Sequence, residues 1–195
     1  MSGILVIISG PSGSGKGEVI KRLDYALSVS VTTRTRRIGE ENGREYFFCN
    51  EEEFARMRDE DLLLEHAVYM GKYYGTPKLY VEEQIAKGNV ALLEIDVNGA
   101  LQVKEKFPEA ILVFMLPPTI EELARRLVNR ATESLSEIDE RIHKSIEEIC
   151  LVEKYDYLVI NDVLEETVKD LNAIISAERQ KPFRLQKKLN KFIGL

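Results

Sequence analysis

The sequence predicts an α/β fold in which a parallel β-sheet core is flanked by helices. Short apolar runs alternate with amphipathic helical patterns along the chain. This alternation is typical of parallel strands joined by right-handed crossovers. A glycine-rich loop follows the first apolar run, and two longer polar stretches, 34–83 and 126–150, interrupt the alternation as insertions.

The expected strands are short and apolar. The first is residues 4–8, a continuous apolar run of the kind that parallel sheets covered on both faces contain. The expected strands that follow are residues 27–31, 90–96, 110–116 and 157–160.

Helices are expected between these strands, the first from about residue 17 to 25, directly after the glycine-rich loop. Several helices have recognisable start signals, because polar side chains at a helix start satisfy free backbone N–H groups. The signals are the helix start at Asn50 with Glu53, the capping-box pair Thr119–Glu122, and Thr76 before Pro77 at a first helical turn.

The 195 residues predict a single domain. Its core is expected at about 1–33, 84–125 and 151–195. An insertion at about 34–83 contains a small β unit around REYFFC, and a charged excursion covers about 126–150. Insertions of this kind often move and carry functional residues.

Composition excludes several classes of protein. The formal net charge of -6 argues against a nucleic-acid-binding surface over the whole molecule. Two cysteines and two histidines without ligand spacing argue against a structural zinc site and fit a reducing cytoplasm. We expect neither a signal peptide nor a membrane span, and the sequence does not decide between a monomer and a homo-oligomer.

The stretch SGPSGSGKGE, residues 9–18, has the spacing of a phosphate-binding loop. Gly10 is followed by four residues and then by Gly15 and Lys16, between a strand and a helix. Backbone N–H groups and the helix N-terminus attract phosphate in this arrangement, and the lysine reaches the outer phosphates. The alternative is a tight turn with a solvated lysine. Gly17 and Glu18 stand where a magnesium-binding Ser or Thr is expected.

Two further groups of residues suggest ligand binding. The stretch SVSVTTRTRRIGEENGREYFF, residues 28–48, has three arginines after a strand, which suit a phosphate dianion. The alternative is a basic surface loop paired with Glu40 and Glu41. Glu65 follows three leucines, and Asp96 ends an apolar strand. Their alternatives are a solvated strand-edge glutamate and a helix cap.

From about residue 4 to about 170, the chain closely resembles the guanylate kinase family. The resemblance rests on SGPSGSGKG, SVSVTTRTRRIGEENGREYFF, LLEHAVYMGKYYGT, LEIDVNGA, LPPTIEELARRLVNRATES and YDYLVIND. It implies a P-loop parallel sheet, a GMP-binding mixed α/β insertion and a helical lid. It also implies phosphoryl transfer from ATP to GMP, and to dGMP, with Mg²⁺.

The resemblance implies a role for each matching residue. It assigns catalysis to Lys16, Arg37, Arg130 and Arg141, and a magnesium contact through water to Glu94. It assigns ATP binding to Gly10, Pro11, Ser12, Gly13, Ser14, Gly15, Lys16, Gly17, Arg126, Arg130 and Asn161. It assigns the GMP phosphate to Ser30, Arg34, Arg37, Tyr46 and Tyr74, and guanine to Glu65, Thr76 and Asp96.

The chain departs from the family pattern at Arg36, Glu94 and Ala131, and by lacking a loop hydroxyl at 17 or 18. Two other functions therefore stay open at this point. One is a guanylate-kinase-like binding module without catalysis, and the other is a related kinase for a phosphorylated sugar. The intact loop and the guanine-type residues favour the nucleotide kinase over both.

The tail from residue 179 to 195 is basic and contains apolar residues at helical spacing. We expect an amphipathic helix that docks on the core. An acidic partner or a nucleic acid site is the alternative.

Overall fold

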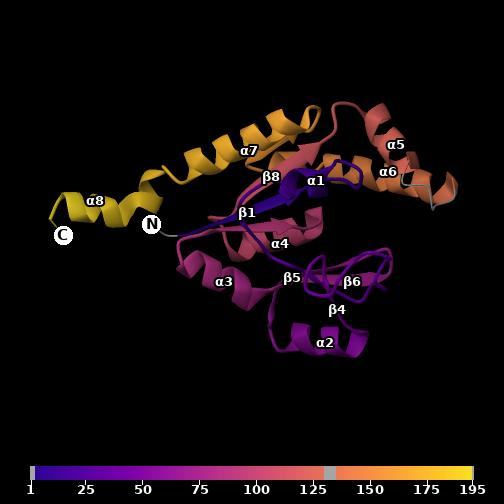
Figure 1. Ribbon diagram of the computed structural model, residues 1–195, viewed down its shortest axis with the longest axis horizontal. Coiled ribbons are helices and arrows are strands. Elements are labelled where there is room, and N and C mark those ends of the chain that lie inside the picture. Colours follow the sequence, from indigo (N-terminus) through magenta and orange to yellow (C-terminus); the bar gives the residue numbers. More distant parts are fainter. Residues whose placement is uncertain (1–2, 130–134, 195) are drawn as a thin grey trace.

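The computed structural model of the chain describes residues 3–129 and 135–194. Within these ranges the strands form one five-stranded sheet and one four-stranded sheet. Figure 1 shows helices on both sides of the larger sheet, and the smaller sheet with α2 beside it. Arg130 and Ala131 lie outside the described residues.

The larger sheet is parallel throughout and has the order β2-β7-β1-β8-β9. The expected strands at 4–8, 90–96, 110–116 and 157–160 are confirmed, with small differences at their ends. The observed strands are β1 (Ile4–Ser9), β2 (Ala26–Leu27), β7 (Val90–Glu94), β8 (Ile111–Leu116) and β9 (Tyr157–Ile160).

The expectation of one strand at 27–31 is wrong, because the chain changes sheets within it. β2 pairs with β7 in the larger sheet, and the Ser28 N–H still donates to the Leu92 carbonyl at 2.9 Å. The chain then enters the smaller sheet as β3 (Val31–Thr32). The segment therefore connects the core directly to the insertion.

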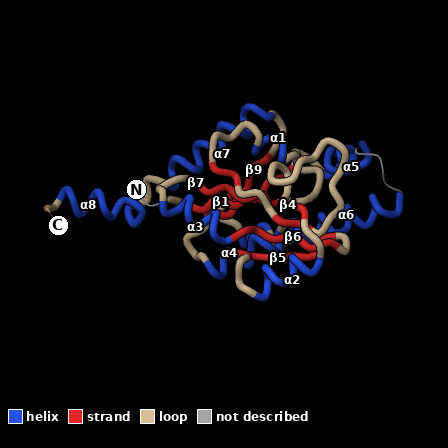
Figure 2. Tube along the Cα trace, turned by 60° about the horizontal axis from the view of Figure 1, so that its bottom comes forward, coloured by secondary structure: helices blue, strands red, loops and turns tan. Residues whose placement is uncertain are grey.

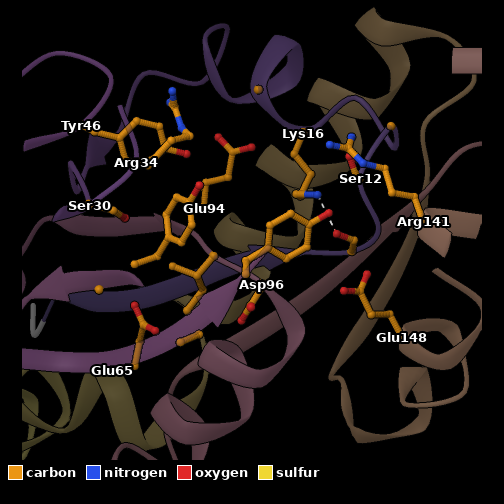
Figure 3. A pocket seen from close by; sticks show the side chains of 18 of the residues that line it. Ser12, Lys16, Ser30, Arg34, Tyr46, Glu65, Glu94, Asp96, Arg141 and Glu148 are labelled. Atoms are coloured by element: carbon orange, nitrogen blue, oxygen red, sulfur yellow. Dashed lines mark hydrogen bonds between the residues drawn. The ribbon is translucent and has the colours of Figure 1, made fainter. Parts of the chain in front are cut away.

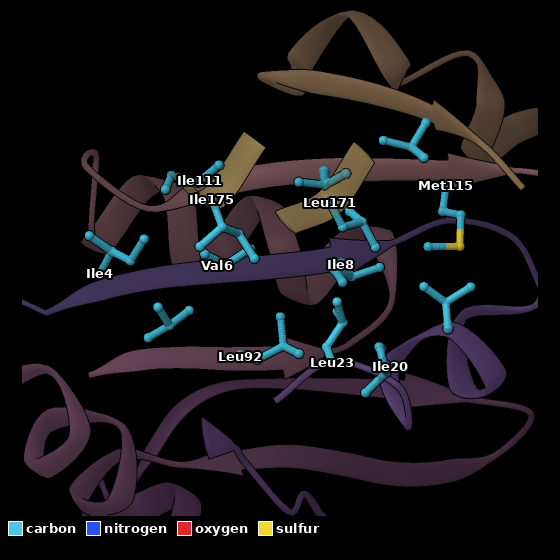
Figure 4. Packing of buried hydrophobic residues seen from close by; sticks show 14 residues of the cluster. Ile4, Val6, Ile8, Ile20, Leu23, Leu92, Ile111, Met115, Leu171 and Ile175 are labelled. Carbon is cyan, nitrogen blue, oxygen red and sulfur yellow. The ribbon is translucent and has the colours of Figure 1, made fainter. Parts of the chain in front are cut away.

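Alternate residues of β1 supply two apolar cores, one on each face of the larger sheet. Ile4, Val6 and Ile8 pack on the face covered by α1 (Lys16–Ile20) and α7 (Leu164–Glu178), as Figure 4 shows. Leu5 and Ile7 pack on the opposite face, under α3 (Lys78–Ala86) and α4 (Val97–Lys106). Side chains of a strand alternate between faces, so a continuous apolar run fits a strand buried on both sides.

The smaller sheet has the order β4-β3-β6-β5 and mixes parallel and antiparallel pairs. Its remaining strands are β4 (Phe47–Phe48), β5 (Leu63–Tyr69) and β6 (Lys72–Pro77). Phe54 of α2 (Glu51–Asp59) packs on Val31 and Leu63 under this sheet. The expected helix start at Asn50 and Glu53 is confirmed, and the structure shows that the two residues form a capping box.

The other two helix-start signals are only partly realised. The Glu122 N–H donates to the Thr119 hydroxyl at 3.1 Å, but the Glu122 carboxylate binds Arg125 and Arg126 instead of completing a capping box. Pro77 is the N-cap of α3, and Thr76 belongs to β6.

The chain between β8 and β9 contains α5 (Ile120–Asn129), α6 (Leu135–Ile149) and a 3-10 turn η1 (Val152–Lys154). The first helix, α1, ends at Ile20, earlier than the expected residue 25. Among the described helices, none combines the length and the apolar composition needed to cross a membrane.

The C-terminal segment contains a 3-10 turn, η2 (Pro182–Leu185), and a helix, α8 (Gln186–Phe192). The expectation of a helix is confirmed, but docking of this helix on the core is wrong. Leu189, Phe192 and Ile193 are 46%, 86% and 56% exposed, and both views show α8 extending away from the body (Figures 1 and 2). Only the turn before it is anchored, through the buried Arg184.

The central strands should dominate the stability of the fold. Leu112 of β8 is fully buried, so Leu112→Ala is expected to lower the free energy of unfolding by about 2–5 kcal/mol. Leu158→Ala in β9, where the side chain is half exposed, is the matched control and should change it by less than about 1 kcal/mol. Urea unfolding followed by circular dichroism measures both, and equal losses would contradict this assignment of the core.

Candidate active site

One cavity of about 350 Å³ lies where the glycine-rich loop, the carboxyl end of β7, the smaller sheet and α6 meet (Figure 3). Ligands of open α/β sheets bind at the carboxyl ends of the strands. Most residues singled out from the sequence line this cavity: Gly10, Ser12, Gly13, Gly15, Lys16, Gly17, Ser30, Arg34, Arg37, Tyr46, Glu65, Tyr74, Glu94, Asp96 and Arg141.

Gly10 and Gly15 of the glycine-rich loop combine a positive φ with a crowded backbone, so each position requires glycine. Gly10 has φ +139° and a Cβ there would overlap the Met115 carbonyl, while Gly15 has φ +89° and a Cβ would overlap the Asn161 amide. Lys16 Nζ donates to the Gly10 carbonyl at 2.6 Å. The lysine therefore already lies across the loop, with its charge at the place where outer phosphates would bind.

Two residues expected to bind ATP support the loop from outside the cavity lining. Asn161 is buried and its Nδ2 donates to the Ser14 carbonyl at 2.8 Å. Arg126 Nη1 reaches the same carbonyl at 3.4 Å, and Arg126 Nε binds the Glu122 carboxylate at 2.6 Å. Pro11 and Ser14 are also absent from the lining. These contacts hold the loop shape, and Arg126 keeps one edge of its guanidinium on the loop.

The arginine-rich segment forms an ordered basic corner. Arg34 Nη2 binds the Glu40 carboxylate at 2.8 Å, and the other oxygen of Glu40 accepts from the Arg37 N–H at 2.8 Å. The Arg34 guanidinium also lies 5.2 Å from the centre of the Tyr46 ring. Arg34 holds the pKa of Glu40 below its usual range. Arg34 thus pairs with Glu40, as the surface-loop alternative predicts. Arg34, Arg37 and Glu40 nevertheless all line the cavity, as expected for a phosphate-binding site.

Neutral hydroxyl groups complete this corner. The Tyr46 and Tyr74 rings meet edge to face, 5.9 Å apart, and Ser30 lies on the same side of the cavity. Burial, followed by the charge of Glu94, raises the pKa of Tyr46 to about 12. The phenol therefore stays protonated and can donate a hydrogen bond to an anion.

Glu65 is a buried carboxyl group aimed at the other end of the cavity. It is 3% exposed and accepts a hydrogen bond of 2.7 Å from the Thr76 hydroxyl. Burial raises the pKa of Glu65 to about 7, against the lowering effect of Thr76. Thr76 itself is buried and absent from the cavity lining, so it acts on Glu65 and not at the cavity surface.

Asp96 lies beside Glu65 and has two functions in the structure. Its Oδ1 accepts from the Gly99 N–H at 2.7 Å, so it is the N-cap of α4. Asp96 also lines the cavity. The sequence left a helix cap and a ligand-binding residue as alternatives, and the structure allows Asp96 to be both. Gly99 is needed here because a Cβ would come within 2.6 Å of a Glu65 oxygen.

Helix α6 closes the side of the cavity opposite the smaller sheet. Arg141 and Glu148, seven residues apart on one helix face, both line it. Lys144 lies between them, and its Nζ is 3.9 Å from the centre of the Tyr69 ring. Burial raises the pKa of Glu148, and Lys144 and Lys16 oppose this rise.

Sequence reasoning missed Glu148 and Tyr69 as lining residues. The i, i+7 spacing of Arg141 and Glu148 was the available signal for the first. The turn residues Met70 and Gly71, both with positive φ, mark the hairpin that presents Tyr69. Other lining residues not assigned a role are Glu40, Ala67, Gly75 and Ile95.

Glu94 is the lining carboxylate that fits a magnesium ion. It ends β7 beside the loop, and a Cβ at Gly17 would lie 3.9 Å from its oxygens. Magnesium uses few protein carboxylates and keeps several waters, so one oxygen donor is sufficient. Glu18 instead forms an ion pair of 2.7 Å with Lys21 and does not line the cavity. The described residues contain no cluster of three or more metal-binding side chains.

The raised pKa of Glu65 has a consequence for stability. Between about pH 4.5 and 7 the unfolded chain releases a proton that the folded chain retains, so stability falls as pH rises, by up to about 3 kcal/mol. The amide side chain of the Glu65→Gln variant cannot ionise, so this variant should not lose stability in that way as the pH rises. The gain in unfolding free energy from Glu65→Gln should therefore be larger at pH 8 than at pH 5, as measured by urea unfolding. The exposed Glu52→Gln is the control, and an effect of Glu65→Gln that does not change with pH would contradict the raised pKa.

Comparison with known proteins agrees with this geometry. A family model described as guanylate kinase matches residues 2–178. The guanylate kinase of Caldanaerobacter subterraneus subsp. tengcongensis is 50% identical over 182 residues, covering 91% of this chain and 88% of that protein. That of Oceanobacillus iheyensis is 45% identical over 196 residues, covering 98% and 95%.

Solved structures extend the similarity to three dimensions. The crystal structure of guanylate kinase from Anaplasma phagocytophilum superposes with a TM-score of 0.83 at 33% identity, covering 100% of this chain and 97% of that one. The TT1252 protein of Thermus thermophilus, at a TM-score of 0.52 and 17% identity, shares the fold alone. With the family model matching nearly the whole chain and relatives at 45–50% identity, this chain belongs to the guanylate kinase family.

Proposed function

We propose that this protein transfers the γ-phosphoryl group of ATP to GMP, and to dGMP, giving ADP and the corresponding diphosphate. The observation that carries this proposal is the single cavity that joins a phosphate-binding loop to a basic corner and a buried carboxyl group. These three parts match, in order, a nucleoside triphosphate, the phosphate of a monophosphate and its base.

ATP binds at the glycine-rich loop in this proposal. Backbone N–H groups of Gly13 and Gly15 and the N-terminus of α1 face the phosphates, and Lys16 exchanges its carbonyl partners for phosphate oxygens. Arg126 and Asn161 hold the loop and border the nucleotide. The described part of residues 126–150, with Arg141, forms a lid over the γ-phosphate. Arg130, which the resemblance assigns to the same lid, lies outside the described residues.

GMP binds across the cavity with its phosphate in the basic corner. Arg34 and Arg37 supply the charge, and Ser30, Tyr46 and Tyr74 supply neutral donors. The Arg34–Glu40 ion pair presents one guanidinium edge in a fixed direction, which favours forked binding of phosphate oxygens. Residues 34–83 form the GMP-binding part of the domain.

Guanine is read by Glu65 and Asp96. The Watson–Crick edge of guanine presents N–H donors, which pair with carboxylate acceptors. Adenine presents a ring acceptor there and would leave the acceptors unpaired. Unpaired polar groups of this kind discriminate by about 10⁴ or more. Thr76 contributes by fixing the orientation of the Glu65 carboxyl group.

The reaction needs no general base in this chain. The second pKa of a phosphate monoester is about 6, so the GMP phosphate is mostly a dianion near neutral pH and attacks directly. Lys16 and Arg37 hold the two phosphates in line and neutralise charge, and Arg141 approaches from α6. Enclosure by α6 excludes water, which would otherwise accept the phosphoryl group.

Glu94 would hold the magnesium that accompanies ATP, through water. The ion supplies charge neutralisation between the phosphates. The loop has no hydroxyl at 17 or 18, and water can replace that single ligand.

A coupled assay of ADP formation across GMP, dGMP, AMP, UMP and CMP tests this function. Activity is expected with GMP and dGMP alone. Lys16→Ala keeps the loop backbone and should lower kcat at least about a hundredfold, because it removes charge from the transferring group. Activity with none of these nucleotides would favour a binding module. Undiminished activity of a folded Lys16→Ala protein would remove Lys16 from the mechanism.

Glu65→Gln tests how guanine is read. An amide can place a donor against a donor of guanine, so the KM for GMP should rise at least about tenfold, while the KM for ATP stays the same. The exposed Glu52→Gln on α2 should behave as the wild type. Steady-state kinetics with each nucleotide varied in turn measures both values, and an equal rise for ATP would indicate a structural effect instead.

A further inference from the structure

Helix α8 and the residue after it form an apolar face that no other part of the described chain covers. Leu189, Phe192 and Ile193 are at i, i+3 and i+4, so they share one side of the helix. They are 46%, 86% and 56% exposed, respectively. We call these three residues the tail face. Exposed apolar side chains gathered on one side mark an interaction surface.

The base of this helix is held firmly to the body. Arg184 is 8% exposed, and its Nη2 donates to the Glu109 carbonyl at 2.7 Å and lies 3.8 Å from the Glu178 carboxylate. Glu178 is 2% exposed and also binds Lys181 Nζ at 2.6 Å and the Tyr157 hydroxyl at 2.7 Å. This buried network fixes the turn from which α8 projects, so the tail face has a defined position.

The charge of the tail identifies the kind of surface that it fits. Residues 179–195 contain six of the chain's 27 basic residues and none of its 33 acidic ones. Lys188 and Lys191 lie on α8 beside the tail face. The rest of the chain is therefore more acidic than the net charge of -6 indicates. Two tails would repel each other, while the body of a second copy would attract one.

A matching surface exists on α3 and the segment before β5. Leu62, Leu79 and Tyr80 are 46%, 69% and 38% exposed, and the Lys78 N–H joins the two segments by donating to the Leu62 carbonyl at 2.9 Å. Four acidic residues border these apolar side chains. Two lysines lie among them, and these pair with Asp61 and Glu83. We call this surface the α3 patch, and its acidic residues are Glu60, Asp61, Glu82 and Glu83.

We propose that the tail face docks on the α3 patch of a second copy of this chain, forming a reciprocal dimer. In Figures 1 and 2, α8 and α3 lie toward the same end of the molecule, away from α5 and α6. A two-fold axis near that end allows the tail face of each copy to bind the α3 patch of the other copy, so the contact is made twice. Doubling matters because one short helix buries little area compared with the roughly 1,000 Å² of a stable interface.

Sedimentation velocity of the full chain tests this proposal. The wild type is expected to dimerise at micromolar concentration. Phe192→Asp on the tail face and Leu79→Asp on the α3 patch should each raise the dissociation constant at least about tenfold. Ile120→Asp on α5 changes a comparably exposed apolar residue, 42% exposed, at the other end and outside the lid, and should leave the dimer intact.

Two further readouts separate this interface from other outcomes. Raising the salt concentration should weaken the dimer, because opposite charges border the contact. All variants should keep their far-ultraviolet circular dichroism, and Phe192→Asp should also keep GMP-dependent ATP consumption, since the tail face does not line the nucleotide cavity. A monomeric wild type overturns the proposal, and so does a dimer that Leu79→Asp leaves intact. Association that strengthens with salt would indicate tail-to-tail packing and also overturn it.

Discussion

The parallel pairing of β1 with β7 and β8 is the constraint on which the site depends. Ile8 lies opposite Glu94, and Ser9 lies opposite Phe114, so all three strands end at one edge. The glycine-rich loop leaves β1 at this edge, and Glu94 and Asp96 leave β7 beside it. A shift of one residue in either pairing would move the loop away from the carboxylates and turn the apolar side chains of β1 to the wrong faces.

Groups of the protein itself hold the charges of the cavity in position. Lys16 is held by loop carbonyls and Arg34 by Glu40, so each cation has a partial partner that phosphate oxygens can supplement or replace. Glu65 differs, because the Thr76 hydroxyl that donates to it is neutral and burial favours its protonated form. One end of the cavity thus offers positive charge and the other a carboxyl group that a set of N–H donors can convert to carboxylate.

Local sequence patterns predicted most strands and one helix start, whereas the change of sheet and part of the cavity lining depend on tertiary contacts. Apolar runs located most strands, and Asn50 with Glu53 located a helix start, because each signal acts within a few residues. The run at 27–31 gave no sign of the change of sheet, since both sheets accept β-forming residues. Glu148 and Tyr69 escaped notice because their position in the cavity depends on how α6 faces the hairpin. Amphipathicity in α8 predicted a helix but could not specify which molecule covers it.

The contact between Lys144 and Tyr69 joins α6 to the hairpin of the smaller sheet across the cavity. A cation–π contact at a partly exposed site is worth about 0.5–1 kcal/mol, which changes an equilibrium between open and closed forms by about two- to fivefold. This is enough to bias the molecule toward enclosure and too little to trap a product. Any movement that opens this side of the cavity has to break this contact, and thermal energy is sufficient to break it.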